Sequence, residues 1–359
     1  MDNALIWDEL RRVAAGASDR VALQGSEPGA QRFTYRETIE LASRLGHALA
    51  AAGVRAGDRV ALWSPVSPGW ALAYLGILAS GGVVVPLDPS ADAAAAAGPV
   101  RATHCTLLVA AAELLSSRRP GDNEALSGVP AMPLETFIAG VTRPCSDERP
   151  RPDDPRQAAA TVTGTDVATV IFTSGTTGEP RGVVIAHAAV SAAVSGMRDY
   201  MDLSPRDNVL AIVPSHHVFA PVGNLLVPLA AGATITYASV VSGPELLKVI
   251  RDRQITVFPS VPQVFYALHR RIFDQVRRRS LVQRSLFFTT LFLCRGLRRY
   301  ARINPGRSFF TEIHAALGGS LRVFVSGGRF GQSGRPSLDV VADPNVMVLQ
   351  RWARGERPG

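Results

Sequence analysis

The sequence predicts an α/β fold of two stacked subdomains with mainly parallel sheets flanked by helices. Short apolar segments of strand length alternate along the chain with segments of helical spacing, which is the pattern of a doubly wound sheet. Two windows, residues 60–87 and 208–244, contain no Asp, Glu, Lys or Arg but are interrupted by prolines and glycines. A membrane-spanning helix needs about 20 continuous apolar residues, so these windows indicate buried strand–helix–strand units.

The first subdomain is predicted over residues 1–117. The helix expected at 35–52 carries Ile39, Leu41, Leu45 and Leu49 on one face and ends at Gly53. The other elements expected here are strands at 21–24, 60–63 and 83–87 and a helix at 70–79. An alanine-rich segment at 91–99 is read as low complexity, and residues 118–160 are predicted to be a polar connector because they are rich in Pro, Asp, Arg and Ser.

The second subdomain is predicted over residues 161–328. Its expected strands are 167–172, 208–213, 234–238, 255–258 and 321–325, and its expected helices are 188–200, 224–230, 244–253 and 263–279. The last segment, residues 329–359, is rich in Gly, Arg, Pro and Ser and is predicted to be disordered.

Composition bounds the class of protein. The chain has 359 residues, 47% hydrophobic and 19% charged, with a net charge of +8, so it can bury a sizeable core. The cations are arginines apart from Lys248, a skew that we attribute to base composition, and nucleic acid is not an expected partner because no binding motif accompanies them. Cys105, Cys145 and Cys294 suit neither a disulfide framework nor a zinc site, and no signal peptide is evident, so a cytoplasmic location is expected.

Residues 173–182, Thr-Ser-Gly-Thr-Thr-Gly-Glu-Pro-Arg-Gly, are the most informative segment. Glycines let a backbone approach a phosphate closely, the hydroxyls add donors, and Arg181 adds a permanent planar cation. The alternative is a flexible polar hairpin loop. The segment is not a Walker loop, because it lacks the Gly-Lys-Ser/Thr ending. We therefore interpret it as a polyphosphate-binding loop.

The order TSGTTGEPRGVVIAH resembles the signature loop of the adenylate-forming superfamily of AMP-dependent synthetases and ligases. This superfamily includes acyl-CoA synthetases, luciferases and the adenylation domains of peptide synthetases. The resemblance runs from about residue 21 to residue 328, and Arg181 stands where the family usually has lysine. It implies ATP-dependent activation of a carboxylic acid, with a fatty acid favoured, as an acyl-adenylate, followed by thioester formation with CoA. The cofactors and co-substrates implied are ATP, Mg²⁺ and CoA.

The resemblance also assigns roles to residues. Glu179 is expected to face solvent. The β- and γ-phosphates are assigned to Thr173, Ser174, Gly175, Thr176, Thr177, Gly178 and Arg181. Gly327 and Gly328 match the start of the loop that contacts adenine and ribose, and residues 257–265 are expected either to line an acyl tunnel or only to pack in the core. No residue is assigned as a metal ligand.

Residues 214–219 resemble the motif in which a histidine follows a strand, in the form closest to long-chain fatty acyl-CoA ligases. His217 is the expected catalytic residue, because a neutral imidazole can orient an incoming carboxylate by a hydrogen bond. The alternative is a histidine pair that only caps a strand end. The arginine-rich stretch at 270–307 is either a basic amphipathic membrane-surface helix or a helix pair covering the sheet, so a peripheral membrane contact is a further expectation.

Beyond residue 328 the family pattern stops, and the elements that carry the magnesium-holding glutamate, the ribose-binding aspartate and the catalytic lysine are not matched. We therefore expect a C-terminally truncated member, with residues 329–359 arising from a shifted reading frame and with impaired turnover. Two alternatives stay open. One is an inactive fragment that at most binds nucleotide, and the other is an acyl-AMP ligase or an amino-acid adenylation domain.

Overall fold

The computed structural model describes most of the predicted secondary structure. The described residues are 5–116, 126, 128–142, 162–173, 181–239, 242–260, 264, 270, 273–274, 276–301, 318–326 and 346–348, with side chains left out for 295–301, 326 and 346–348. Two compact units are present, unit 1 (Met1–Arg206 and Val213–Tyr237) and unit 2 (Asp207–Ile212 and Ala238–Gly359). These units divide the chain differently from the predicted subdomains, whose boundaries stay a prediction.

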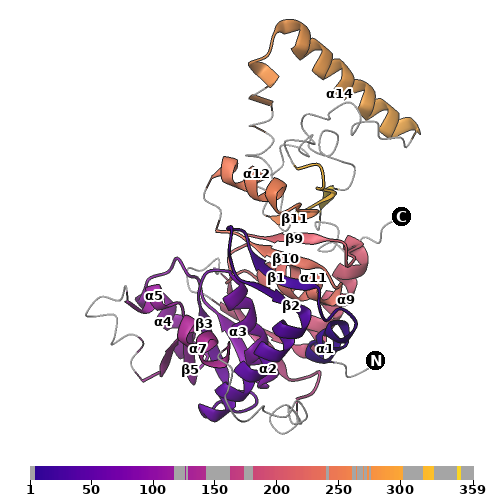
Figure 1. The fold of residues 1–359 in the computed structure, drawn as a ribbon. Coiled ribbons are helices and arrows are strands. Elements are labelled where there is room, and N and C mark those ends of the chain that lie inside the picture. The colour runs from indigo at the N-terminus through magenta and orange to yellow at the C-terminus, as the bar shows by residue number, and fades with distance from the viewer. Residues whose placement is uncertain are drawn as a thin grey trace. The chain divides into compact units, whose positions relative to one another are not determined.

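Unit 1 contains a six-stranded sheet in the order β6-β5-β3-β4-β7-β8, which is parallel except at β8 (Figure 1). Its strands are β3 (Arg59–Trp63), β4 (Val83–Pro86), β5 (Leu107–Ala110), β6 (Ala131–Pro133), β7 (Val167–Thr173) and β8 (Arg181–Ala186). A second group pairs β1 (Val21–Gly25) in parallel with β10 (Thr234–Tyr237) and antiparallel with β2 (Arg32–Thr34). The predicted α/β class with mainly parallel sheets is confirmed.

The helices of unit 1 follow the predicted alternation with strands. They are α1 (Ile6–Gly16), α2 (Tyr35–Ala51), α3 (Pro68–Ala79), α4 (Ala93–Ala102), α5 (Ala112–Ser116), α7 (Leu134–Thr142), α9 (His187–Met201), α10 (Phe219–Pro221), the π-helix η1 (Val222–Leu226) and α11 (Val227–Ala230). Helix α2 begins at a capping box, in which the Thr34 hydroxyl accepts from the Glu37 N–H and the Glu37 carboxylate accepts from the Thr34 N–H.

The first of the two uncharged windows folds as predicted. It forms β3, α3 and β4. Helix α3 is apolar on all sides, which is typical of a helix whose residues are almost all buried. Within the described part of the chain, no helix combines the length and the hydropathy needed to cross a bilayer.

Two stretches of unit 1 are more ordered than predicted. The alanine-rich segment expected to be low complexity forms α4, because alanine has the highest helix propensity and the Asp92 carboxylate caps the helix by accepting from the Ala95 N–H at 2.8 Å. Part of the expected polar connector at 118–160 forms β6 and α7, whose Leu134, Phe137 and Ile138 are buried. The connector prediction therefore does not describe residues 131–142.

Unit 2 contains four strands in the order β13-β12-β11-β9, all parallel. They are β9 (Asn208–Ala211), β11 (Val257–Ser260), β12 (Val323–Ser326) and β13 (Val346–Val348), accompanied by α12 (Gly243–Asp252) and α14 (Leu281–Ala301). Strand β11 starts later than predicted and includes Pro259, which lies beyond its pairing with β9 at Val257. Strand β13 lies inside the tail predicted to be disordered, so that prediction does not hold for Val346–Val348; the rest of 327–359 lies outside the described residues.

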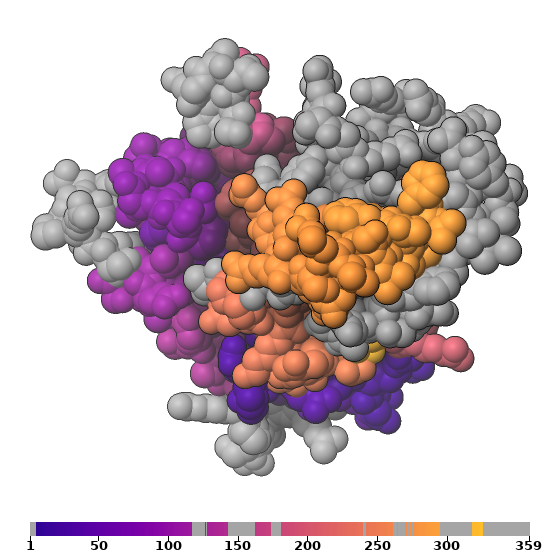
Figure 2. Space-filling model, turned by 90° about the horizontal axis from the view of Figure 1, so that it is seen from above, coloured from indigo at the N-terminus to yellow at the C-terminus, as the bar shows by residue number. Residues whose placement is uncertain are grey.

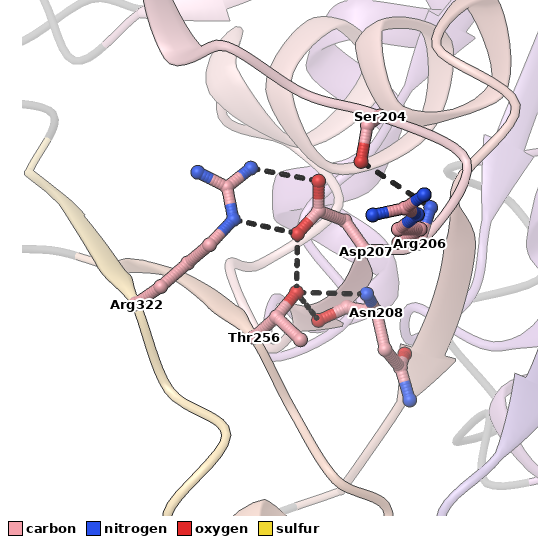
Figure 3. A network of polar contacts seen from close by, with 6 residues as sticks. All are labelled: Ser204, Arg206, Asp207, Asn208, Thr256 and Arg322. Atoms are coloured by element: carbon pink, nitrogen blue, oxygen red, sulfur yellow. Dashed lines mark hydrogen bonds and ion pairs between the residues drawn. The ribbon is translucent and has the colours of Figure 1, made fainter.

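A buried carboxylate organises the edge of unit 2 where β9 and β11 begin (Figure 3). The Asp207 side chain is 3% exposed and binds the Arg322 guanidinium through two bonds, from Nε at 2.8 Å and from Nη2 at 2.7 Å. The Thr256 hydroxyl donates to the same carboxylate at 2.7 Å and accepts from the Asn208 N–H at 2.9 Å. This network therefore connects the beginnings of β9, β11 and β12.

Two glycines set the close approach of α2 and α3, which lie side by side in unit 1 (Figure 1). A Cβ added at Gly76 would lie 2.7 Å from the Leu45 Cβ, and one added at Gly46 would lie 3.2 Å from the Gly76 carbonyl oxygen. Side chains at either position would separate the two helices.

We expect Gly76→Ala to lower the free energy of unfolding by about 1–3 kcal/mol, because overpacking a tight helix contact forces a backbone shift. The matched control is Gly140→Ala in α7, where an added Cβ meets no atom within 4 Å. That change is expected to stabilise by roughly 0.5–1 kcal/mol, since alanine restricts the unfolded chain. Denaturant unfolding of both variants provides the measurement, and equal effects would contradict the packing argument.

Candidate functional site

The β7–β8 hairpin holds the two ends of the glycine-and-hydroxyl loop side by side. The strands pair antiparallel with Thr173 opposite Arg181, and the Thr173 hydroxyl donates to the Arg181 carbonyl oxygen at 3.5 Å. Both residues are exposed. Two of the predicted phosphate-binding residues therefore lie side by side at the loop end of the hairpin.

The remaining predicted phosphate and nucleotide residues cannot be placed in the same way. Ser174, Gly175, Thr176, Thr177 and Gly178 lie outside the described residues, and so do Gly327 and Gly328. Strand β12 ends directly before the last two glycines. Their assigned contacts stay predictions.

The loop end of the hairpin lies at the carboxyl edge of the six-stranded sheet, that is, where its parallel strands end. Strand β7 pairs in parallel with β4, with Thr169 opposite Val84. Thr173 and Asp88 each lie four residues beyond this pair (173 − 169 and 88 − 84), so both belong to the same edge. In parallel α/β sheets, ligands bind at the carboxyl ends of the strands.

A buried serine fastens the histidine pair to this edge. The Ser215 hydroxyl is fully buried and donates to the Ser64 carbonyl oxygen at 2.9 Å, with the Leu87 carbonyl oxygen at 3.5 Å. Ser64 and Leu87 directly follow β3 and β4. The structure thus brings His216 and His217 to the sheet edge that also carries the hairpin.

The two histidines and one carboxylate form a small electrostatic group. The His216 Nδ1 lies 3.4 Å from the Asp88 Oδ1, an ion-pair distance without hydrogen-bond geometry. The His216 and His217 rings are in contact in a tilted arrangement, with centroids 4.2 Å apart and an interplanar angle of 43°. Burial lowers the pKa of His216, the Asp88 carboxylate opposes this, and His217 adds to the lowering. Burial raises the pKa of Asp88, but hydrogen bonds from Ser90 and the nearby histidines outweigh it and leave that pKa below its usual range.

These shifts predict a pH dependence with a definite sign. Because the pKa of His216 is lower in the folded chain, the unfolded chain takes up the proton at a higher pH than the folded chain does. The stabilisation by the neutral ring is therefore complete above the unfolded pKa of about 6.5 and decreases as the pH falls below it. We expect the His216 ring to titrate below the ordinary histidine range by NMR. Asp88→Asn should lower that pKa further, because it removes the carboxylate that raises it. An unchanged or higher pKa in this variant would contradict the assignment.

Three side chains near His217 were not found by sequence reasoning. Asp88 follows a buried strand, which is a signal that could have identified it, whereas nothing in the sequence marks Ser215 as buried. The π-helix η1 contains Asn224, which is 2% exposed and whose amide atoms have no hydrogen-bond partner among the residues that the structure describes. Just before it, the Phe219 ring lies over Gly223, where an added Cβ would come within 2.5 Å of the ring. π-Helical turns are frequent at functional sites.

A pocket of about 680 Å³ in unit 1 borders the hairpin but not the histidines. It is lined by Arg59 and Val83, the first residues of β3 and β4, and by Phe172 and Val184 of the hairpin. Its lining therefore extends from the amino ends of β3 and β4 along the hairpin to the pair Phe172–Gly182, next to Thr173 and Arg181, and does not include the histidines. No group of three or more His, Cys, Asp or Glu that could hold a metal ion occurs in the part of the chain that the structure describes.

Comparison with known proteins identifies the family. Residues 10–331 match the model described as AMP-binding enzyme. The 3-[(3aS,4S,7aS)-7a-methyl-1,5-dioxo-octahydro-1H-inden-4-yl]propanoyl:CoA ligase of Rhodococcus jostii (strain RHA1) is 31% identical over 261 residues, which cover 67% of this chain and 49% of the relative. Tyrocidine synthase 3 of Brevibacillus parabrevis is 30% identical over 254 residues, 70% of this chain and 4% of that protein.

Solved structures support the same fold. The N-terminal domain of FACL13 from Mycobacterium tuberculosis has a TM-score of 0.67 at 20% identity, covering 96% of this chain and 74% of that one. The peptide synthetase FmoA3 gives the same TM-score at 23% identity, over 96% of this chain and 31% of that one. The chain spans about half the length of the curated CoA ligase that it matches. Because the family model covers most of its residues, this chain belongs to the AMP-binding enzyme family.

Proposed function

We propose that this protein activates a carboxylic acid with ATP as an acyl-adenylate. A carboxylate oxygen attacks the α-phosphorus, the bond to the β-phosphate oxygen breaks, and pyrophosphate leaves with that electron pair. The observation that carries the proposal is the placement of Thr173 and Arg181 together at the end of a hairpin on the carboxyl edge of the sheet. An exposed cation beside a loop rich in glycines and hydroxyls suits a polyphosphate.

The proposed roles follow the chemistry of each group. The loop residues and Arg181 bind the β- and γ-phosphates and offset their charge as it moves to the leaving group. When bound with the nucleotide, Mg²⁺ would supply further charge neutralisation. Gly327 and Gly328 keep their proposed role at the adenine and ribose.

His217 is proposed to orient the incoming carboxylate. It is exposed at the carboxyl edge, and its ring contacts the tilted ring of His216, whose pKa is lowered by burial. Contact with a neighbouring ring restricts the rotation of the imidazole, and one of its N–H groups is proposed to donate a hydrogen bond to the acid. The nearby charged Asp88 favours a bound Mg²⁺–nucleotide over a bare anion at this edge.

The finer proposals are a fatty acid as substrate and CoA as acceptor. In the second step the thiol sulfur attacks the acyl carbon and AMP leaves, which gives the thioester. The form of residues 214–219 and the similarity to a CoA ligase support this assignment. Similarity to peptide synthetases supports amino-acid activation as the second candidate. A cytoplasmic location and a peripheral membrane contact complete the proposal, the latter because exposed apolar side chains of α14 lie within the basic stretch at 270–307.

A pyrophosphate-exchange screen tests the acid class. The chain is incubated with ATP, Mg²⁺ and labelled pyrophosphate and with fatty acids, aryl acids or amino acids in parallel. We expect exchange above the no-acid background with fatty acids, and weaker exchange in His217→Ala. Exchange with amino acids only would support the second candidate. No exchange with any acid, together with no ATP binding in calorimetry, would contradict the proposed function.

A further inference from the structure

Helix α14 carries a broad apolar face that points to solvent. Figure 2 shows the orange surface of this part of unit 2 uncovered by other described elements. The exposed fractions are 78% for Leu281, 78% for Val282, 66% for Leu286, 77% for Phe292 and 57% for Leu293. Scattered single apolar residues are normal on a protein surface, but a contiguous group marks an interaction site.

This face is distinct from the one with which α14 packs on its own unit. Leu291 and Cys294 are buried, and the Phe273 ring meets the Phe287 ring edge-on with centroids 5.8 Å apart. At 3.6 residues per turn, the exposed apolar side chains cover an arc of roughly 140° on the other side of the helix. Between residues 281 and 293, that arc also holds Ser285 and Thr289 and no charged residue.

Arginines flank the exposed face at both ends. Between residues 275 and 311 the chain has nine arginines and neither aspartate nor glutamate. Arg277, Arg278 and Arg279 are exposed directly before the helix, with Arg277 at 3.9 Å from Asp274. Arg295, Arg298 and Arg299 lie in its last turns. The described side chains of this face are therefore apolar along the helix and basic at its amino-terminal border, and the sequence adds three arginines at its carboxyl-terminal end.

The helix has a defined start. The Ser280 hydroxyl accepts from the Gln283 N–H and the Gln283 side chain accepts from the Ser280 N–H, both at 3.4 Å, which is a capping box. A helix capped in this way and packed through Phe287 and Leu291 presents its apolar face without first having to fold.

We propose that α14 docks this protein on an anionic lipid surface, with the helix in the plane of the interface and its exposed apolar face among the acyl chains. The arginines at both ends then meet phosphate and carboxylate headgroups. Pairing with a second copy through the same face is disfavoured by charge, because it would set two arginine-rich, acid-free stretches against each other. This docking does not depend on the adenylation chemistry.

Vesicle flotation tests the proposal on the 359-residue chain. The probes are vesicles of phosphatidylcholine with phosphatidylserine, and vesicles of phosphatidylcholine alone. We expect binding to the anionic vesicles, weak binding to the neutral ones, and loss of binding at high salt. Leu286→Gln combined with Phe292→Gln should weaken partitioning by about tenfold or more. Replacing Arg277, Arg278 and Arg279 by glutamine should weaken it by about fivefold per arginine.

Val184→Gln is the matched control, because Val184 is also an exposed apolar residue (62%) but lies on β8 in unit 1, outside α14. This substitution should leave the partitioning unchanged. Circular dichroism checks that each variant is folded. ATP calorimetry on the same samples tests the proposed nucleotide binding separately, so a failure of membrane docking can be told apart from a failure of the proposed function. Equal binding of wild type and the Leu286/Phe292 variant would overturn the proposal, as would absence of binding to anionic vesicles. A stable dimer that the same two substitutions dissociate would assign the face to self-association instead.

Discussion

Replacement of Asp207 by alanine is expected to lower the unfolding free energy of unit 2 by about 3–5 kcal/mol, because it removes a buried carboxylate that accepts two charge-assisted bonds from Arg322 and one bond from the half-buried Thr256 hydroxyl. Two bonds from Arg322 and one from Thr256 converge on this carboxylate, which is almost fully buried (Figure 3). Arg322→Ala should also be destabilising, since it removes the cation that makes two bonds to this buried carboxylate. Urea unfolding followed by far-ultraviolet circular dichroism gives the measurement.

The surface pair Arg36–Asp19 is the matched control for this prediction. Its atoms approach to 3.0 Å, but the two side chains are 58% and 89% exposed, so solvent screens the attraction. Asp19→Ala should leave the unfolding midpoint nearly unchanged. Similar losses for Asp207→Ala and Asp19→Ala would show that burial and bidentate geometry do not set the strength of the pair.

The second large effect is expected at the hairpin loop. Replacing Thr176, Thr177 and Arg181 together by alanine should weaken ATP binding so much that calorimetry no longer detects it. Arg181→Ala alone should weaken it roughly tenfold to a hundredfold, because a hydrogen bond to a charged group contributes about 1.5–3 kcal/mol. Arg181→Lys keeps the charge without the planar fork and should fall between wild type and alanine.

Glu179→Gln is the control in the same loop, because Glu179 is expected to face solvent and its replacement should not weaken ATP binding. Titration of ATP with Mg²⁺ into each folded variant provides the affinities. If the triple variant bound ATP as tightly as the wild type, the loop would not be the phosphate site. The assignment of Thr173 and Arg181, which rests on their shared place at the hairpin end, would then fail too.

Sequence patterns predicted the elements whose burial is one-sided or complete. The apolar spacing of α2 and the uninterrupted apolar runs of β3 and β4 depend on local residues only, so they can be read from the chain. The alanine-rich α4 was missed because a run of alanines shows no alternation of apolar and polar residues, and because its cap depends on the single residue Asp92. Short apolar groups inside polar segments, as in α7, were also missed.

The candidate site divides in the same way. The loop and His217 were found because residues close in sequence carry the pattern. Asp88 and Ser215 were not, because their roles depend on contacts between segments more than a hundred residues apart, such as the bond from Ser215 to Ser64. Asn224 gave no signal either, since nothing in the sequence shows that an amide will be buried without a partner.

The bond that fastens the histidine turn has an evolutionary consequence. Both acceptors of the Ser215 hydroxyl are main-chain carbonyl oxygens, at Ser64 and Leu87, which every amino acid provides. Mutations at positions 64 and 87 can therefore accumulate without displacing His217, whereas position 215 needs a small hydroxyl donor.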